Sequence, residues 1–129
     1  MKSKSKFLIY VALGGFVGTL LRYEIFMFIR SSQYSFPWDT LTVNIVGAFI
    51  VGLVASIIIK ISNPPVSVRP TVLIGFCGAL TTESTMAVNI DKLTSLNELF
   101  IAIIFLIVTL VVGLSAVMFG NKLGELITK

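Results

Sequence analysis

Apolar residues fill most of this 129-residue chain in four long stretches, which short polar or proline-containing segments separate. A helix needs about 20 mostly apolar residues to cross the hydrocarbon core of a bilayer. The pattern therefore predicts an all-α protein with membrane-spanning helices at about 7–29, 40–60, 71–90 and 98–119. These spans leave no room for a soluble domain, so we expect a single four-helix transmembrane domain over residues 1–129.

The third stretch differs from the others because polar residues interrupt it. Gly75 and Gly78 are followed by five polar residues in a row, Thr81-Thr82-Glu83-Ser84-Thr85. Non-helical backbone at membrane depth is tolerated only where it is buried in protein or lines water. We therefore expect the third helix to be broken near Gly78 to Thr81, and we expect the function at this polar segment.

Small residues recur at helical spacing in the first two stretches. Gly14 and Gly18 form a G-x-x-x-G pair, and Ala48, Gly52 and Ser56 follow one another every four residues. Small side chains on one helix face let a second backbone approach closely in a membrane. Both patterns predict helix-packing seams.

Asn44 begins the second of these rows, one turn before Ala48. A carboxamide in lipid needs hydrogen-bond partners. Its side chain is expected either to bond a neighbouring helix or to line a pore.

Two residue patterns indicate where helices begin. Pro70 is suited to the first turn of a helix, because its missing N–H would have no partner there. The spacing Ser95-x-x-Glu98 is that of a capping box and predicts that the fourth helix starts at this point.

The net charge of +4 marks topology rather than a nucleic-acid partner, because the basic residues flank the apolar stretches. Four spans place both termini on one side. That side carries seven basic flanking residues and the other side two: Lys2, Lys4, Lys6, Lys60, Arg69, Lys122 and Lys129 against Arg30 and Lys92. The positive-inside rule predicts cytoplasmic termini and a single orientation in the cell membrane.

The chain has one cysteine, Cys77, and no histidine. This composition excludes an internal disulfide and a Cys/His zinc site. Without a histidine or a lysine inside a span there is no nucleophile–base pair, so we do not expect an enzyme. The lysines before the first apolar stretch resemble a signal peptide, but that stretch continues past Arg22 without a small-residue cleavage pattern.

Four motifs occur in order along the chain. They are Gly14-Gly15-x-x-Gly18-x-x-x-Arg22-Tyr23, Thr40-Leu41-x-Val43-Asn44-x-x-Gly47, Gly75-Phe76-Cys77-Gly78 and Thr81-Thr82-x-Ser84-Thr85. Each is weak alone, but together, in a four-span chain of this length, they resemble the Fluc (CrcB-type) fluoride channels. The match covers essentially the whole chain.

This resemblance implies an antiparallel, dual-topology dimer with two fluoride pores beside the dimer interface. It also implies a central Na+ ion held by backbone carbonyls at the break, here of Gly78 and Thr81. The pore residues implied by the family's motifs are Asn44, Ser84, Thr85 and Ser115, and Arg22 matches the arginine after the first glycine cluster. Members export cytoplasmic fluoride passively and confer fluoride resistance.

The chain departs from the family at Glu83 and Met86, where the motif usually has phenylalanines that line the fluoride path. An ionised Glu83 about 4 Å from a fluoride would repel it by about 4 kcal/mol at an effective dielectric near 20, roughly a thousandfold in occupancy. Glu83 could instead be protonated, or it could pair with a neighbour such as Arg22.

The strong charge bias and the altered pore lining together favour one half of a heterodimer, completed by an oppositely oriented sister subunit. Two other functions stay open. One is a proton-coupled exporter of the small multidrug type, although those carry their membrane glutamate in the first span. The other is a non-conducting structural subunit.

Overall fold

The computed structural model describes residues 2–29, 36–60 and 67–128, and the side chains from Ser5 onward. Within these ranges all regular structure is helical and there is no strand. The elements in order are α1 (Lys2–Phe28), α2 (Trp38–Lys60), η1 (Pro70–Cys77), α3 (Gly78–Leu80), α4 (Glu83–Ser95) and α5 (Leu99–Ile127). The all-α prediction is confirmed.

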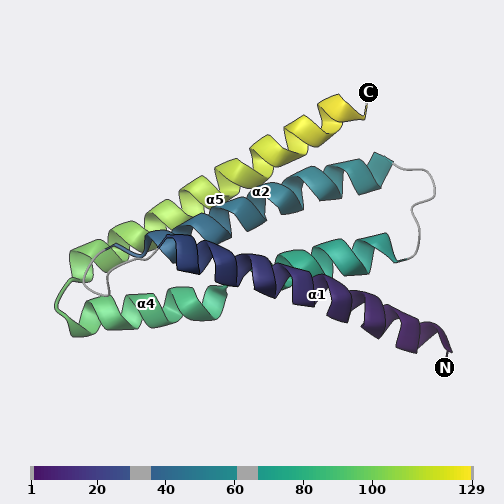
Figure 1. Ribbon diagram of the computed structural model, residues 1–129. Helices are drawn as coiled ribbons and strands as arrows, with labels where there is room; N and C mark the ends of the chain where they lie inside the picture. The colour runs from purple at the N-terminus through teal and green to yellow at the C-terminus, as the bar shows by residue number, and fades with distance from the viewer. Residues whose placement is uncertain (1, 30–35, 61–66, 129) are drawn as a thin grey trace.

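Four helical segments are long and apolar enough to cross a membrane, namely Ser5–Phe28, Trp38–Lys60, Pro70–Ser95 and Leu99–Ile127. The chain is therefore a multi-pass membrane protein. Figure 1 shows both ends of the chain at the same end of the elongated bundle, with α4 and its turn into α5 at the other end. Arg30 and Lys129, which enter the charge count used for orientation, lie outside the described residues.

The packing divides the bundle into two pairs. α1 packs along η1 and α3, and α2 packs along α5, whereas contact between α1 and α2 is slight. The buried apolar residues are few, and Val43, Leu80 and Phe105 are the largest of those that are completely enclosed. Large apolar side chains cover the outer faces of α1 and α5, where lipid or a second subunit can contact them.

Glycine allows α1 and η1 to meet backbone to backbone. A Cβ at Gly14 would overlap the Thr71 carbonyl oxygen, and one at Gly18 would overlap the Phe76 carbonyl oxygen. Gly75 is held in the same way against the Val11 carbonyl oxygen. The close approach that the Gly14/Gly18 spacing favours therefore takes place within this chain, against the first half of the third span.

A second glycine seam joins α2 to α5. A Cβ at Gly52 would overlap the Val117 backbone, and one at Gly120 would overlap the Phe49 carbonyl oxygen. Further along, Gly124 lies against Ser56. These contacts involve two of the three small residues for which a packing seam was predicted on α2.

The third span is broken, as predicted, but the break lies at Thr81 and Thr82. Gly78 is still helical, with φ −65° and ψ −28°. The eight residues before it form a π-helix, which the sequence pattern did not predict. After the break α4 runs to Ser95, beyond the expected end at 90.

The predicted capping box at the start of the fourth span is wrong. Ser95 is the last residue of α4, and Glu98 is itself the N-cap residue of α5, without a side-chain capping bond. Asn97 turns the chain with a positive φ of 61°, which asparagine tolerates better than most residues. α5 also extends past the expected end at 119, because Gly120 and Gly124 continue the seam with α2.

Candidate functional site

The break in the third span replaces helical hydrogen bonds with side-chain bonds. Thr81 and Thr82 have extended backbone, with ψ angles of 152° and 100°. The Thr82 N–H donates to Asn44 Oδ1 at 2.8 Å, and the Thr85 N–H donates to Thr82 Oγ1 at 3.1 Å. The Thr82 hydroxyl thus caps the N-terminus of α4, a position at which threonine is favoured.

Two carbonyl groups lose their usual partners because of this arrangement. In an uninterrupted α-helix the amides of Thr82 and Thr85 would bond the carbonyls of Gly78 and Thr81, four residues earlier. Both amides are instead engaged by side-chain oxygens. Gly78 and Thr81 are the residues whose carbonyls the family resemblance implied as cation ligands.

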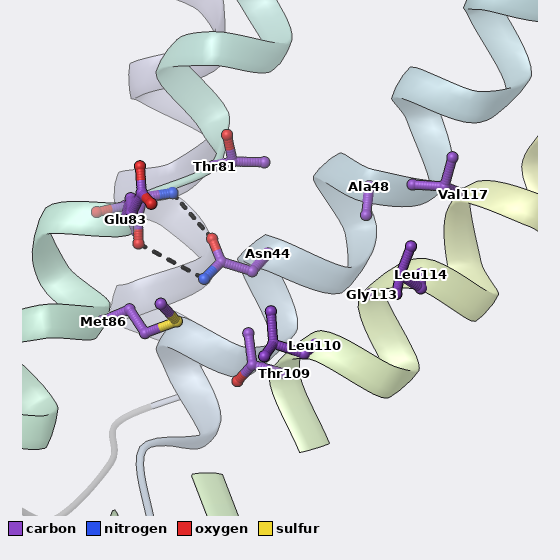
Figure 2. Close-up of a pocket in the computed structure, with 11 residues that line it drawn as sticks. Asn44, Ala48, Thr81, Glu83, Met86, Thr109, Leu110, Gly113, Leu114 and Val117 are labelled. Carbon is purple, nitrogen blue, oxygen red and sulfur yellow. Dashed lines mark hydrogen bonds between the residues drawn. The ribbon is translucent and has the colours of Figure 1, made fainter. Parts of the chain in front are cut away.

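Asn44 holds the break from the side of α2. Its Oδ1 accepts from the Thr82 N–H, and its Nδ2 donates to the Thr82 carbonyl oxygen at 3.5 Å. Figure 2 shows the carboxamide reaching across to the backbone at the break. The side chain also lines an open groove, so Asn44 combines the two roles that the sequence left as alternatives.

The groove lies between α2, the break, α4 and α5 and has a volume of about 340 Å³. Polar groups at the break and apolar side chains of α5 line opposite parts of it, as Figure 2 shows. The lining residues are Asn44, Ala48, Thr81, Thr82, Glu83, Met86, Thr109, Leu110, Gly113, Leu114 and Val117. Ala48, which was expected in the packing seam, faces this groove instead.

The groove brings together four of the predicted site residues, Asn44, Thr81, Glu83 and Met86. The other predicted residues lie outside its lining. Among these, Thr85 is half-buried and bonded to Thr82, with 2.6 Å between the two hydroxyl oxygens, and Ser84 is exposed. Arg22 is half-buried on α1. Gly78, which precedes the break, has open space beside it, since a Cβ there would meet nothing within 4 Å.

On α5 the structure places Thr109, not Ser115, at the groove. Ser115 is exposed, whereas Thr109 is buried. Each hydroxyl donates to the carbonyl oxygen four residues earlier in α5, Ser115 to Val111 and Thr109 to Phe105. Six residues turn a helix by about 600°, so the two hydroxyl groups lie about 120° apart around α5. The family resemblance implied Ser115, and the sequence gives no helical phase with which to choose between these two polar residues of the span.

Thr82 also lines the groove, although the sequence analysis quoted it only as part of a motif and did not predict it as a site residue. A threonine directly before a helical stretch is an N-cap signal, and this signal could have identified it. Its backbone pairing with Asn44 could not have been found in this way, because it joins residues 38 apart in the chain.

Glu83 is an exposed residue in the first turn of α4. A carboxylate there compensates the partial positive charge of a helix N-terminus. Within the described residues no ion pair joins Glu83 to Arg22. The Glu83 side chain lines the groove next to the N-terminus of α4.

Comparison with known proteins covers nearly the whole chain. The family described as "CrcB-like protein, Camphor Resistance (CrcB)" matches residues 9–121. A protein of Citrifermentans bemidjiense named fluoride-specific ion channel FluC is 37% identical over 114 residues, which are 88% of this chain and 92% of that protein. The protein of the same name from Hahella chejuensis is 33% identical over 121 residues, 93% of this chain and 95% of its own length.

A third relative with this name, from Prosthecochloris aestuarii, is 33% identical over 125 residues, 97% of this chain and 98% of its own. The family match covers most of α1 and α5 and everything between them, including the break between α3 and α4. This chain belongs to the CrcB-like family.

Proposed function

We propose that this chain is a subunit of a fluoride-selective channel that lets cytoplasmic fluoride leave the cell passively. The observation that carries the proposal is the groove at the break, where Asn44, Thr82 and Thr109 bring polar groups to a membrane span. A dehydrated anion needs hydrogen-bond donors. Asn44 Nδ2 has two N–H groups and donates one long bond of 3.5 Å, to the Thr82 carbonyl oxygen, so it can offer a donor to the anion. The Thr82 and Thr109 hydroxyls donate to protein oxygen atoms in this structure and would have to exchange those bonds. The relatives' names support fluoride as the ion, and an ion channel agrees with the expectation of a non-enzyme.

The channel is a dimer of oppositely oriented subunits, and the partner is a sister chain rather than a second copy. Two observations support this assembly. The groove is open on one side, so a single subunit does not enclose a pore, and Glu83 with Met86 occupies the wall of α4. The basic flanks give this chain one orientation, with cytoplasmic termini, so an antiparallel partner must have the opposite charge bias.

A structural Na+ ion is part of the proposal. The carbonyl oxygens of Gly78 and Thr81 would coordinate the ion together with oxygen atoms of the partner. These two carbonyls are candidates because the amides that would bond them in a helix, those of Thr82 and Thr85, bond side-chain oxygens instead. The ion would supply a positive charge that stabilises the break and the interface between the subunits.

Fluoride efflux from liposomes tests the proposal. We expect no flux from liposomes that hold this chain alone, and rapid flux when it is reconstituted with a four-span sister that has an intact Thr-Thr-Phe-Ser-Thr-Phe motif and reversed charge bias. Chloride-loaded liposomes are the control for selectivity. Strong flux from this chain alone would contradict the heterodimer, and absence of flux with the sister would identify a non-conducting subunit.

A further inference from the structure

Helix α4 carries two residues of the groove, Glu83 and Met86, yet little apolar packing holds it. Leu93 is the one buried residue of this helix within the described chain. Helix α4 packs mainly against α5, and this contact is much less extensive than the contact between α2 and α5. The position of α4 must therefore depend strongly on polar contacts.

Such contacts reach α4 from α2 at two levels. At the start of α4, Asn44 bonds both backbone groups of Thr82. Two turns further along, Asn89 Nδ2 donates to Thr40 Oγ1 at 2.7 Å. Thr40 is fully buried and Asn89 is half-buried, so little water competes for this bond.

The two levels of contact show how α4 runs relative to α2. Thr40 and Asn44 are four residues apart and therefore share a face of α2. Thr82 is the N-cap residue directly before α4, and Asn89 lies about two turns into this helix. The order of the contacts is reversed between the helices, which means that α4 runs antiparallel to α2 along this pair of ties.

We propose that Thr40 and Asn89 are positioning residues of the channel and that their hydrogen bond sets the inclination of α4 at the groove. Asn44 fixes one end of the helix, and the limited packing against α5 leaves the inclination of the rest of α4 weakly determined. The Asn89–Thr40 bond is a second point of attachment. Neither residue lines the groove, so both act through the placement of Met86 and Glu83 opposite α5.

The inference can be tested by measuring how fast a small methanethiosulfonate reagent modifies a cysteine in the groove. The protein carries Cys77→Ala, which removes its single and buried thiol, and Met86→Cys as the reporter on α4. Thr40→Val and Asn89→Ala each remove the bond. We expect each to raise the modification rate about threefold, since a hydrogen bond between membrane helices typically changes an equilibrium by about this factor.

Three controls separate a displaced helix from a loosened protein. Thr42→Val makes the same chemical change two residues along α2, where the side chain has no hydrogen bond in the described structure, and should leave the rate unchanged. Thr40→Ser retains the hydroxyl and should also leave it unchanged. Leu114→Cys reports from the α5 wall of the same groove, and its rate should not respond to Thr40→Val.

The double variant Thr40→Val/Asn89→Ala should match the single variants, because one bond is lost in each case. Unchanged rates at Met86→Cys in both single variants would overturn the inference, and so would an equal rise at Leu114→Cys. The measurement does not use fluoride, so a chain that fails to conduct fluoride can still confirm or refute the role of Thr40 and Asn89.

Discussion

The α2–α5 pair and helix α4 form two walls of one groove, but different forces hold them. α2 and α5 meet at glycines whose backbones touch the opposite helix, with Gly52 against Val117 and Gly120 against Phe49. α4 is attached through the side chains of Asn44 and Asn89, with little buried apolar surface. The α2–α5 wall is thus fixed by close packing, which leaves no space for an added atom. The α4 wall is held by a few hydrogen bonds, which can be replaced by bonds to other groups.

Adding one methyl group should show most clearly how tightly the α2–α5 wall is packed. Gly52→Ala places a Cβ on the Val117 backbone and should lower the free energy of unfolding by about 3 kcal/mol, because neither helix can yield. Gly113→Ala makes the same change on the groove side of α5, where a Cβ would meet nothing within 4 Å, and should change it by less than about 0.5 kcal/mol.

Thermal unfolding of the purified protein in detergent measures both variants. Equal stability of Gly52→Ala and Gly113→Ala would show that the α2–α5 seam is looser than the backbone contacts indicate.

The polar wall should be sensitive to the loss of Asn44. Asn44→Leu leaves the N–H and carbonyl of Thr82 without their partner and should cost about 2 kcal/mol of stability. Asn121→Leu is the matched control, because Asn121 is exposed on α5 and makes no hydrogen bond in the described structure. The same unfolding measurement applies, and a stability equal to that of Asn121→Leu would mean that Asn44 does not hold the break.

A change at Glu83 should affect conduction rather than stability. If repulsion by an ionised Glu83 disables the pore wall, Glu83→Gln should raise fluoride flux roughly tenfold in the channel reconstituted with its sister. This is less than the roughly thousandfold effect of a carboxylate about 4 Å from a fluoride, because Glu83 is exposed and its charge would be screened. Glu98→Gln, in the turn before α5, is the control of equal chemistry and should leave the flux unchanged. Flux that does not respond to Glu83→Gln would remove electrostatic repulsion as the reason for a disabled pore wall.

Hydropathy and small-residue spacing predicted what depends on local pattern. The four spans, the interruption of the third and the close approach at Gly14 and Gly18 follow from residue type and period. The exact place of the break did not follow, because it depends on Asn44 competing for the Thr82 amide from another helix. The π-helix η1 was missed for a similar reason, since its glycine contacts with α1 are tertiary.

The candidate site shows the same division between local and tertiary information. Asn44 could be named from the sequence because a carboxamide inside an apolar span is unusual. Glu83 and Met86 could be named because they depart from the motif of the family that the chain resembles. Asn89 could not, because an asparagine close to the end of a span is an ordinary residue until its partner Thr40 is known. The choice of Thr109 over Ser115 needed the rotation of α5 about its axis, which packing against α2 determines.

The glycine contact between α1 and η1 has a mechanical consequence. With no side chain between their backbones at Gly14, Gly18 and Gly75, these helices cannot slide or roll independently and form one stiff block. α2 and α5 form the second block, and few contacts join the two. The extended residues Thr81 and Thr82 lie where the chain leaves the first block. A second subunit that contacts both blocks would therefore restrict their motion relative to each other.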